Sequence, residues 1–153
     1  METSQIVQPS LPRWYWVVAA VALLWNLMGC AAFSMEMFAP EVMMKEWSAE
    51  QKEWAHSIPS WIYFVYAVAV ISGVAASIGL FLRKGWSGSL FVISLVAIFV
   101  QMVYTMIIAG GVKIMGPSSV VMPGLVIFIA AVLVWFARFA KGKGWLLSKA
   151  TQS

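Results

Sequence analysis

The chain has 153 residues, of which 62% are apolar and only 10% are charged, and its formal net charge is +4. Soluble domains average about 25% charged and roughly 45–50% apolar residues, so this composition excludes a protein that folds in water and indicates one that folds in a membrane. With one histidine, one cysteine and six acidic residues, all glutamates, the chain also lacks the residues for a four-ligand zinc site, a Ser-His-Asp triad or an internal disulfide. We therefore expect a non-enzymatic protein with no metal and no cofactor.

Four apolar stretches are long enough to cross a bilayer, because a spanning helix needs about 20 residues. They are bounded by prolines, glycines or basic residues and cover about 14–33, 60–82, 87–109 and 122–139. The sequence therefore predicts an all-α integral membrane four-helix bundle. We interpret residues 1–153 as a single transmembrane domain that ends in a basic cytoplasmic tail over 140–153.

The loops differ in their content of lysine and arginine, and cytoplasmic loops carry the excess in membrane proteins. If the N-terminus is inside, seven basic residues fall on the cytoplasmic side, namely Arg13, Arg83, Lys84, Arg138, Lys141, Lys143 and Lys149, and three fall outside, namely Lys45, Lys52 and Lys113. We therefore expect both termini in the cytoplasm. Because most of the basic residues border apolar spans, we interpret the net positive charge as a topology signal and expect no nucleic-acid partner.

The largest polar segment, 34–59, follows the first span and is expected outside. Pro40 suits a first helical turn, and Ser48 with Gln51 has the spacing of a capping box, so two short helices are predicted. Apolar and acidic residues alternate with helical period, which places Met43, Met44, Trp47, Trp54 and Ile58 on one face and Glu46, Glu50 and Glu53 on the other. The pattern predicts an amphipathic helical loop that rests on the outer leaflet or caps the bundle, and a lid over a ligand site is the alternative.

Two amides are expected at similar depth inside the membrane. Asn26 lies twelve residues after Trp14, and Gln101 lies fifteen after Trp86, on two spans that run in the same direction at about 1.5 Å per residue. A hydrogen bond between them would hold the first and third spans together. The alternative is that the two amides line a small polar cavity, because buried polar groups in membranes are often functional.

Further polar side chains are expected near the outer ends of the spans. Tyr104 lies one turn beyond Gln101, Tyr66 comes to that depth from the second span, and Glu36 lies at the outer end of the first span. Small multidrug transporters use a glutamate at mid-depth in their first helix, but Glu36 lies further out, so we expect it to be interfacial and solvated. An outward-facing vestibule would have five ligand-binding candidates, namely Asn26, Gln101, Tyr104, Glu36 and Tyr66.

The second and fourth spans differ in composition. The second span carries a stripe of small residues that lets helices approach closely, namely Ser72, Gly73, Ala76, Ser77 and Gly79. The fourth span has no polar side chain over 125–135 and is expected to face lipid or another subunit.

The stretch Leu27-Met28-Gly29-Cys30 resembles a lipobox, in which the cysteine becomes lipid-modified. Because the apolar run continues past Cys30, we expect Gly29 and Cys30 to be packing residues, with lipidation of Cys30 as the alternative.

Several strings in the chain resemble a family of small four-helix bacterial inner-membrane proteins that are often labelled "sugar transporter" and have no established activity. They are RWYWVVAAVALLWNLMGCAAF, IPSW, GLFLRKGWSGSLFVISL, QMVYT and VMPGLVIFIAAVLVWFAR, with WNLMG and RKGWSGSLFVISL the most specific. The resemblance extends from Arg13 to about Trp145. It implies a multi-pass protein of the bacterial inner membrane and carries over no catalytic residues.

Two functions remain open at this point. In the first, the protein is a structural, accessory or partner-binding module that packs in the lipid bilayer with a second copy or with another membrane protein. In the second, it is an oligomeric transporter of a small solute or a lipid-like ligand.

Overall fold

The computed structural model describes residues 9–147, and its long elements are four helices: α1 (Arg13–Phe38), α4 (Ser60–Phe81), α5 (Ser87–Val103) and α7 (Val121–Gly142). With the short helical turns that extend α5 and precede α7, four segments are long and apolar enough to cross a membrane, namely Arg13–Phe38, Ser60–Phe81, Ser87–Ile108 and Pro117–Gly142. The prediction of an all-helical protein with four segments long and apolar enough to span a membrane is confirmed. The predicted basic tail is described only as far as Leu147, and Lys149 lies outside the described residues.

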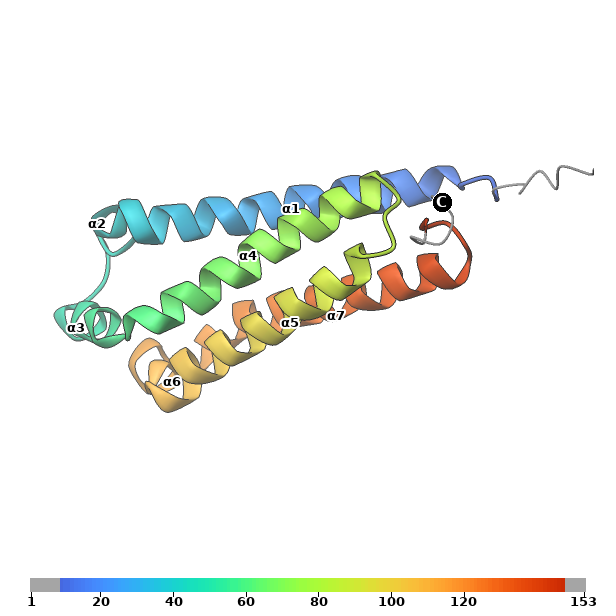
Figure 1. Ribbon diagram of the computed structural model, residues 1–153. Coiled ribbons are helices and arrows are strands. Elements are labelled where there is room, and N and C mark those ends of the chain that lie inside the picture. The colour runs from blue at the N-terminus through green and yellow to red at the C-terminus, as the bar shows by residue number, and fades with distance from the viewer. Residues whose placement is uncertain (1–8, 148–153) are drawn as a thin grey trace, which may run out of the picture.

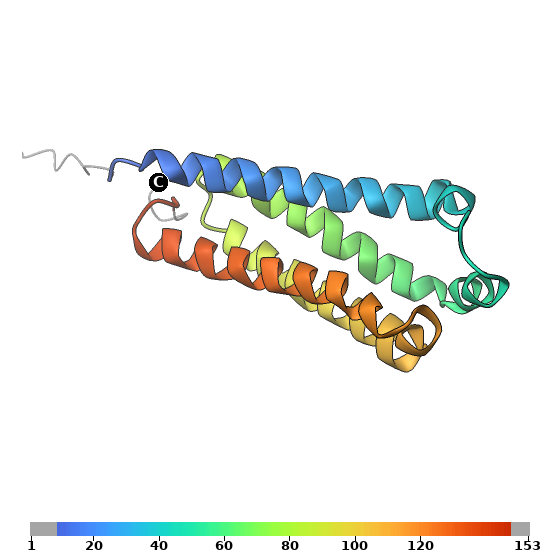
Figure 2. The ribbon, with the colours of Figure 1, turned by 180° about the vertical axis from the view of Figure 1, so that it is seen from behind.

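The four long helices run up and down in chain order, and each packs mainly against the next (Figure 1). The beginning of α1, the α4–α5 loop and the end of α7 lie together at one end of the bundle, which we call the terminal end. The short helices α2 (Pro40–Met43), α3 (Ala49–Ser57) and α6 (Gly111–Met115) lie at the opposite end, the cap end. Seen from behind, α1 and α7 diverge toward the cap end (Figure 2).

The main core of the bundle lies at the terminal end, where aromatic residues from three helices meet. Tyr15 is fully buried, and its hydroxyl donates a 2.6 Å hydrogen bond to the carbonyl oxygen of Leu80. Its ring lies 5.8 Å from that of Phe136 and 5.9 Å from that of Trp145. Aromatic pairs stabilise by about 0.5–1.5 kcal/mol beyond their buried area, so this cluster joins α1, α4 and α7 firmly at one end.

The loop between α4 and α5 is bound to the segment that follows α7. The side-chain Nε of Arg83 donates to the carbonyl of Trp145 (2.8 Å), and the backbone N–H of Leu147 donates to the carbonyl of Arg83 (2.6 Å). The N–H of Gly85 donates in turn to the carbonyl of Leu147 (2.9 Å). Arg83 has a φ of 55°, a conformation that costs a non-glycine residue about 1–2 kcal/mol. These hydrogen bonds offset that cost and close the terminal end.

The cap end is built from the loop that the sequence places between the first and second spans. Ser48 and Gln51 form the expected capping box at the start of α3, with Gln51 N–H to Ser48 Oγ at 3.2 Å and Ser48 N–H to Gln51 Oε1 at 2.9 Å. The indole N–H of Trp54 donates to the carbonyl of Ala109 (2.8 Å). This bond ties α3 to the end of the third span, while Glu50 and Glu53 are exposed. The short helices therefore cap the bundle.

The third span changes its helical form before it ends. Residues Tyr104–Ile108 form a π-helix, and the N–H of Ala109 donates to the carbonyl of Tyr104 (2.8 Å). The hydroxyl of Thr105 donates to the carbonyl of Gln101 (2.9 Å). Gly110 then adopts a φ of 75°, and a Cβ on Gly111 would lie 2.6 Å from the Thr105 carbonyl oxygen. The two glycines therefore make the tight corner onto which Trp54 docks.

Candidate functional site

Half-way along the bundle, polar side chains of α1, α4 and α5 form what we call the central polar layer, made of Asn26, Gly73, Ser77 and Ser94. The Asn26 amide Nδ2 donates to the carbonyl of Ala22 (2.8 Å) on its own helix and to Ser77 Oγ (3.0 Å) on α4. Ser77 Oγ donates to the carbonyl of Gly73 (2.9 Å). The amide is therefore bonded across the α1–α4 contact.

The third helix joins this layer through a serine. Ser94 Oγ on α5 donates to the carbonyl of Ala69 on α4 (2.8 Å). A Cβ on Gly73 would collide with the side-chain oxygen of Asn26 and lie 3.1 Å from Ser94 Oγ. Glycine is therefore needed where α1, α4 and α5 approach one another, and the predicted packing role of the small-residue stripe is confirmed by the burial of Ser72, Gly73, Ala76, Ser77 and Gly79.

The predicted hydrogen bond between Asn26 and Gln101 is wrong. Asn26 bonds to the second span through Ser77, whereas the third span meets this layer at Ser94, two turns before Gln101. Antiparallel neighbours α1 and α4 pack directly, whereas α1 and α5 make little direct contact with each other. Gln101 therefore lies two helical turns nearer the cap end than Asn26, and the expected equal depth of the two amides is wrong as well.

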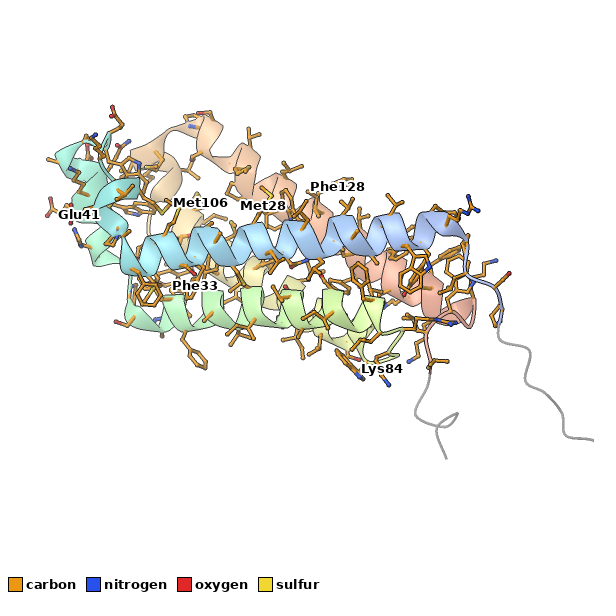
Figure 3. The ribbon with its side chains drawn as sticks, turned by 90° about the horizontal axis from the view of Figure 1, so that it is seen from above. Met28, Phe33, Glu41, Lys84, Met106 and Phe128 are labelled. Atoms are coloured by element: carbon orange, nitrogen blue, oxygen red, sulfur yellow. The ribbon has the colours of Figure 1, made fainter. Side chains whose placement is uncertain are left out.

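A second polar layer lies two helical turns nearer the cap end. Seven residues along a helix return to nearly the same face, so Phe33 repeats the position of Asn26, Tyr66 that of Gly73 and Gln101 that of Ser94. The rings of Phe33 and Tyr66 meet edge to face with centroids 4.9 Å apart, and Phe33 lies between α1 and α4 (Figure 3). We call Glu36, Tyr63, Tyr66 and Gln101 the cap-side polar layer.

Glu36 supplies the charge of the cap-side polar layer. The residue is half-buried near the end of α1 and lies close enough to Tyr63 and Tyr66 for electrostatic interaction with both hydroxyl groups. Within residues 9–147 its carboxylate forms no ion pair and no hydrogen bond, and the side chains of Tyr63, Tyr66 and Gln101 form no hydrogen bond either. Part of the Glu36 side chain is thus covered by the chain itself, and its position at the membrane interface stays a prediction.

Tyr104 lies outside the cap-side polar layer. Its ring contacts Trp61 with centroids 5.0 Å apart, and Trp61 is five residues from Tyr66 on α4. At 100° per residue the two side chains point about 140° apart around the helix. The structure therefore brings Glu36 together with Tyr63 and Tyr66. The helical repeat puts Gln101 on the Ser94 face of α5, whereas Tyr104 lies outside the group and Asn26 belongs to the central polar layer.

Two hollows in the described part of the chain are lined by none of the residues of the two polar layers. A groove of about 360 Å³ between α4 and α5 is lined by Val65, Val68, Val92, Ile93, Val96 and Ala97. A second hollow of about 330 Å³ at the cap end is lined by Glu50, Glu53, Trp54, Ser57, Ala109 and Ile114. Among the described residues no three His, Cys, Asp or Glu side chains converge on a point where they could hold a metal ion.

Comparison with known protein families, curated proteins and solved structures found no match. The functional argument therefore rests on the geometry of the chain itself. Sequence reasoning singled out Asn26 and the second-span stripe but missed Ser94 as a member of the central polar layer. The available signal was the seven-residue spacing from Ser94 to Gln101, which places both on one face of α5.

Proposed function

We propose that this chain is a non-enzymatic four-span protein of the bacterial inner membrane that acts as a structural or accessory module. In this proposal it binds a membrane partner, either a second copy or another membrane protein. One observation carries the proposal: the side chains of the central polar layer form hydrogen bonds with groups of the chain's own helices. A transporter would need such groups for its cargo.

The exposed sides of the outer helices support partner binding. Only 11% of the most apolar stretch of α1 is buried inside the chain, against 44% for α4. In the described chain, the ring contacts between α1 and α7 join Trp14 and Tyr15 to Phe136, all at the terminal end. Toward the cap end both helices therefore have large apolar side chains without a protein neighbour, and Met28 and Phe128 lie on the side of the molecule away from α4 (Figure 3).

The orientation in this proposal follows from charge. The terminal end holds Arg13, Arg83 and Lys84 together with Arg138, Lys141 and Lys143 at the end of α7, so it is the cytoplasmic end under the positive-inside rule. The cap end, with exposed Glu41, Glu46, Glu50 and Glu53, is then outside. The bacterial location rests on the sequence resemblance.

Site-specific photo-crosslinking in intact membranes tests partner binding. A photoreactive residue at Leu24 of α1 or Phe128 of α7, which are 63% and 65% exposed, is expected to crosslink to protein. Ile71 of α4 is equally exposed at 64% but faces away from the neighbouring helices, so it serves as the matched control and is expected to label lipid alone. Equal protein crosslinking at the three positions, or none at any, contradicts the proposal.

A second function, transport of a small solute or lipid-like ligand by an oligomer, is favoured by one observation. The polar side chains of the cap-side polar layer have no hydrogen-bond partner within residues 9–147 and are thus available to a ligand. Flux into proteoliposomes that Glu36→Gln abolishes while the protein remains folded would establish this function in place of the first.

A further inference from the structure

The two polar layers of the bundle differ in how their hydrogen-bonding capacity is used. In the central polar layer the Asn26 amide and the hydroxyls of Ser77 and Ser94 all donate to groups of the chain. In the cap-side polar layer no side chain bonds to another described residue, although every member is half-buried. None of their side-chain nitrogen or oxygen atoms is among the buried polar atoms of the described chain that lack a partner, so these groups are accessible and free to bind a ligand.

The chemistry of the cap-side polar layer selects the charge of that ligand. Its charged member is the Glu36 carboxylate, which lies within electrostatic range of Tyr66, and the Tyr66 ring contacts that of Phe33, one turn before Glu36 on α1. A carboxylate repels anions, and a single carboxylate without other metal-ligating residues nearby is a poor site for a metal ion. An ammonium group is attracted both by the carboxylate and by the faces of aromatic rings.

The residues around the cap-side polar layer indicate what the remainder of the ligand is like. The residues that flank Glu36 on α1, Met35 and Met37, are apolar and exposed, by 47% and 43%. A ligand whose ammonium group reaches Glu36 would therefore place the remainder of its structure against apolar surface in the membrane. This arrangement suits an amphiphile with an alkyl tail.

We infer that Glu36, Tyr63, Tyr66 and Gln101 form a binding site for the ammonium group of an amphiphile, with Glu36 as its counter-ion and Tyr66 as its aromatic contact. The ammonium group belongs either to the headgroup of a membrane lipid or to a free long-chain amine. Binding at this site requires neither partner contact nor transport, so its failure leaves the crosslinking experiment unaffected.

The test uses the full chain in nanodiscs of phosphatidylglycerol, a lipid without an ammonium group. Dodecylammonium is titrated in by calorimetry, with empty nanodiscs as the reference for partitioning into the bilayer. In a second arm, nanodiscs that contain equal amounts of phosphatidylethanolamine and phosphatidylglycerol are analysed by native mass spectrometry for the lipid that remains on the protein. Retention of phosphatidylethanolamine identifies a lipid headgroup as the source, whereas binding of dodecylammonium alone identifies a free amine.

Three variants decide whether the binding belongs to this site. Glu36→Gln, which keeps the shape of the side chain, is expected to weaken binding by about tenfold or more, and Tyr66→Leu by about threefold to tenfold through loss of the cation–π contact. Glu41→Gln is the matched control, because Glu41 is exposed in α2, and it is expected to bind like the wild type. Unchanged affinity in both Glu36→Gln and Tyr66→Leu, or binding of neither probe by the wild type, would overturn the inference.

Discussion

Gly73→Ala should destabilise the bundle more than any other single added methyl group in the central polar layer. The new Cβ would collide with the Asn26 side-chain oxygen and lie 3.1 Å from both Asn26 Cγ and Ser94 Oγ. Overpacking of a tight contact costs about 1–3 kcal/mol, and displacement of Asn26 loses a membrane hydrogen bond of about 0.6–2 kcal/mol. The expected loss in the free energy of unfolding is therefore about 2–4 kcal/mol, measured by equilibrium unfolding in mixed micelles.

Two further variants make this prediction specific. Gly124→Ala in α7 is the control, because nothing lies within 4 Å of its added Cβ, and it should unfold within about 0.5 kcal/mol of the wild type. Asn26→Ala combined with Gly73→Ala should cost less than the sum of the two single changes, since the colliding amide is gone. A Gly73→Ala protein as stable as the control, or strictly additive effects in the double variant, would refute the packing argument.

Two other contacts give equally direct predictions. Tyr15→Phe removes the buried hydrogen bond to Leu80 (2.6 Å) and should lower the free energy of unfolding by about 1–3 kcal/mol. Tyr104→Phe should change it by less than about 0.5 kcal/mol, because the Tyr104 hydroxyl makes no hydrogen bond within the described chain. Similar losses of stability in the two variants would disprove the distinction. Trp54→Phe removes the hydrogen bond to the Ala109 carbonyl. It should speed amide hydrogen exchange in residues 49–57 and 109–115 without changing exchange in α7. Unaltered exchange at the cap end would show that this hydrogen bond does not hold α3.

The spans and their ends followed from the sequence because they depend on local physical signals. A run of about 20 apolar residues has few alternatives to a membrane helix, and Ser48 with Gln51 specifies the start of α3 by its spacing alone. The close approach at Gly73 was also indicated by the small residues around it. These signals act within one helix and need no knowledge of its neighbours.

The partners of the polar side chains depended on which helices pack together. Residue counting from the span ends placed Asn26 and Gln101 at the same depth, but it leaves the tilt and rotation of each helix and the order of the helices undetermined, and Gln101 lies two turns nearer the cap end. Neither the π-helix at Tyr104–Ile108 nor the left-handed conformation of Arg83 has a local sequence signature. Both arise where the chain is held by contacts distant in sequence, such as Trp54 with Ala109 and Arg83 with Trp145.

The central claim is that the mid-membrane polar groups hold the bundle together. The most direct test compares the free energies of unfolding of Asn26→Leu and Gln101→Leu in the same mixed micelles. Asn26→Leu should lose about 1–2 kcal/mol, because it removes the bond to Ser77 (3.0 Å), and Gln101→Leu should be neutral or slightly stabilising, since its amide bonds to no described residue. A stable Asn26→Leu protein beside a destabilised Gln101→Leu protein would contradict the account.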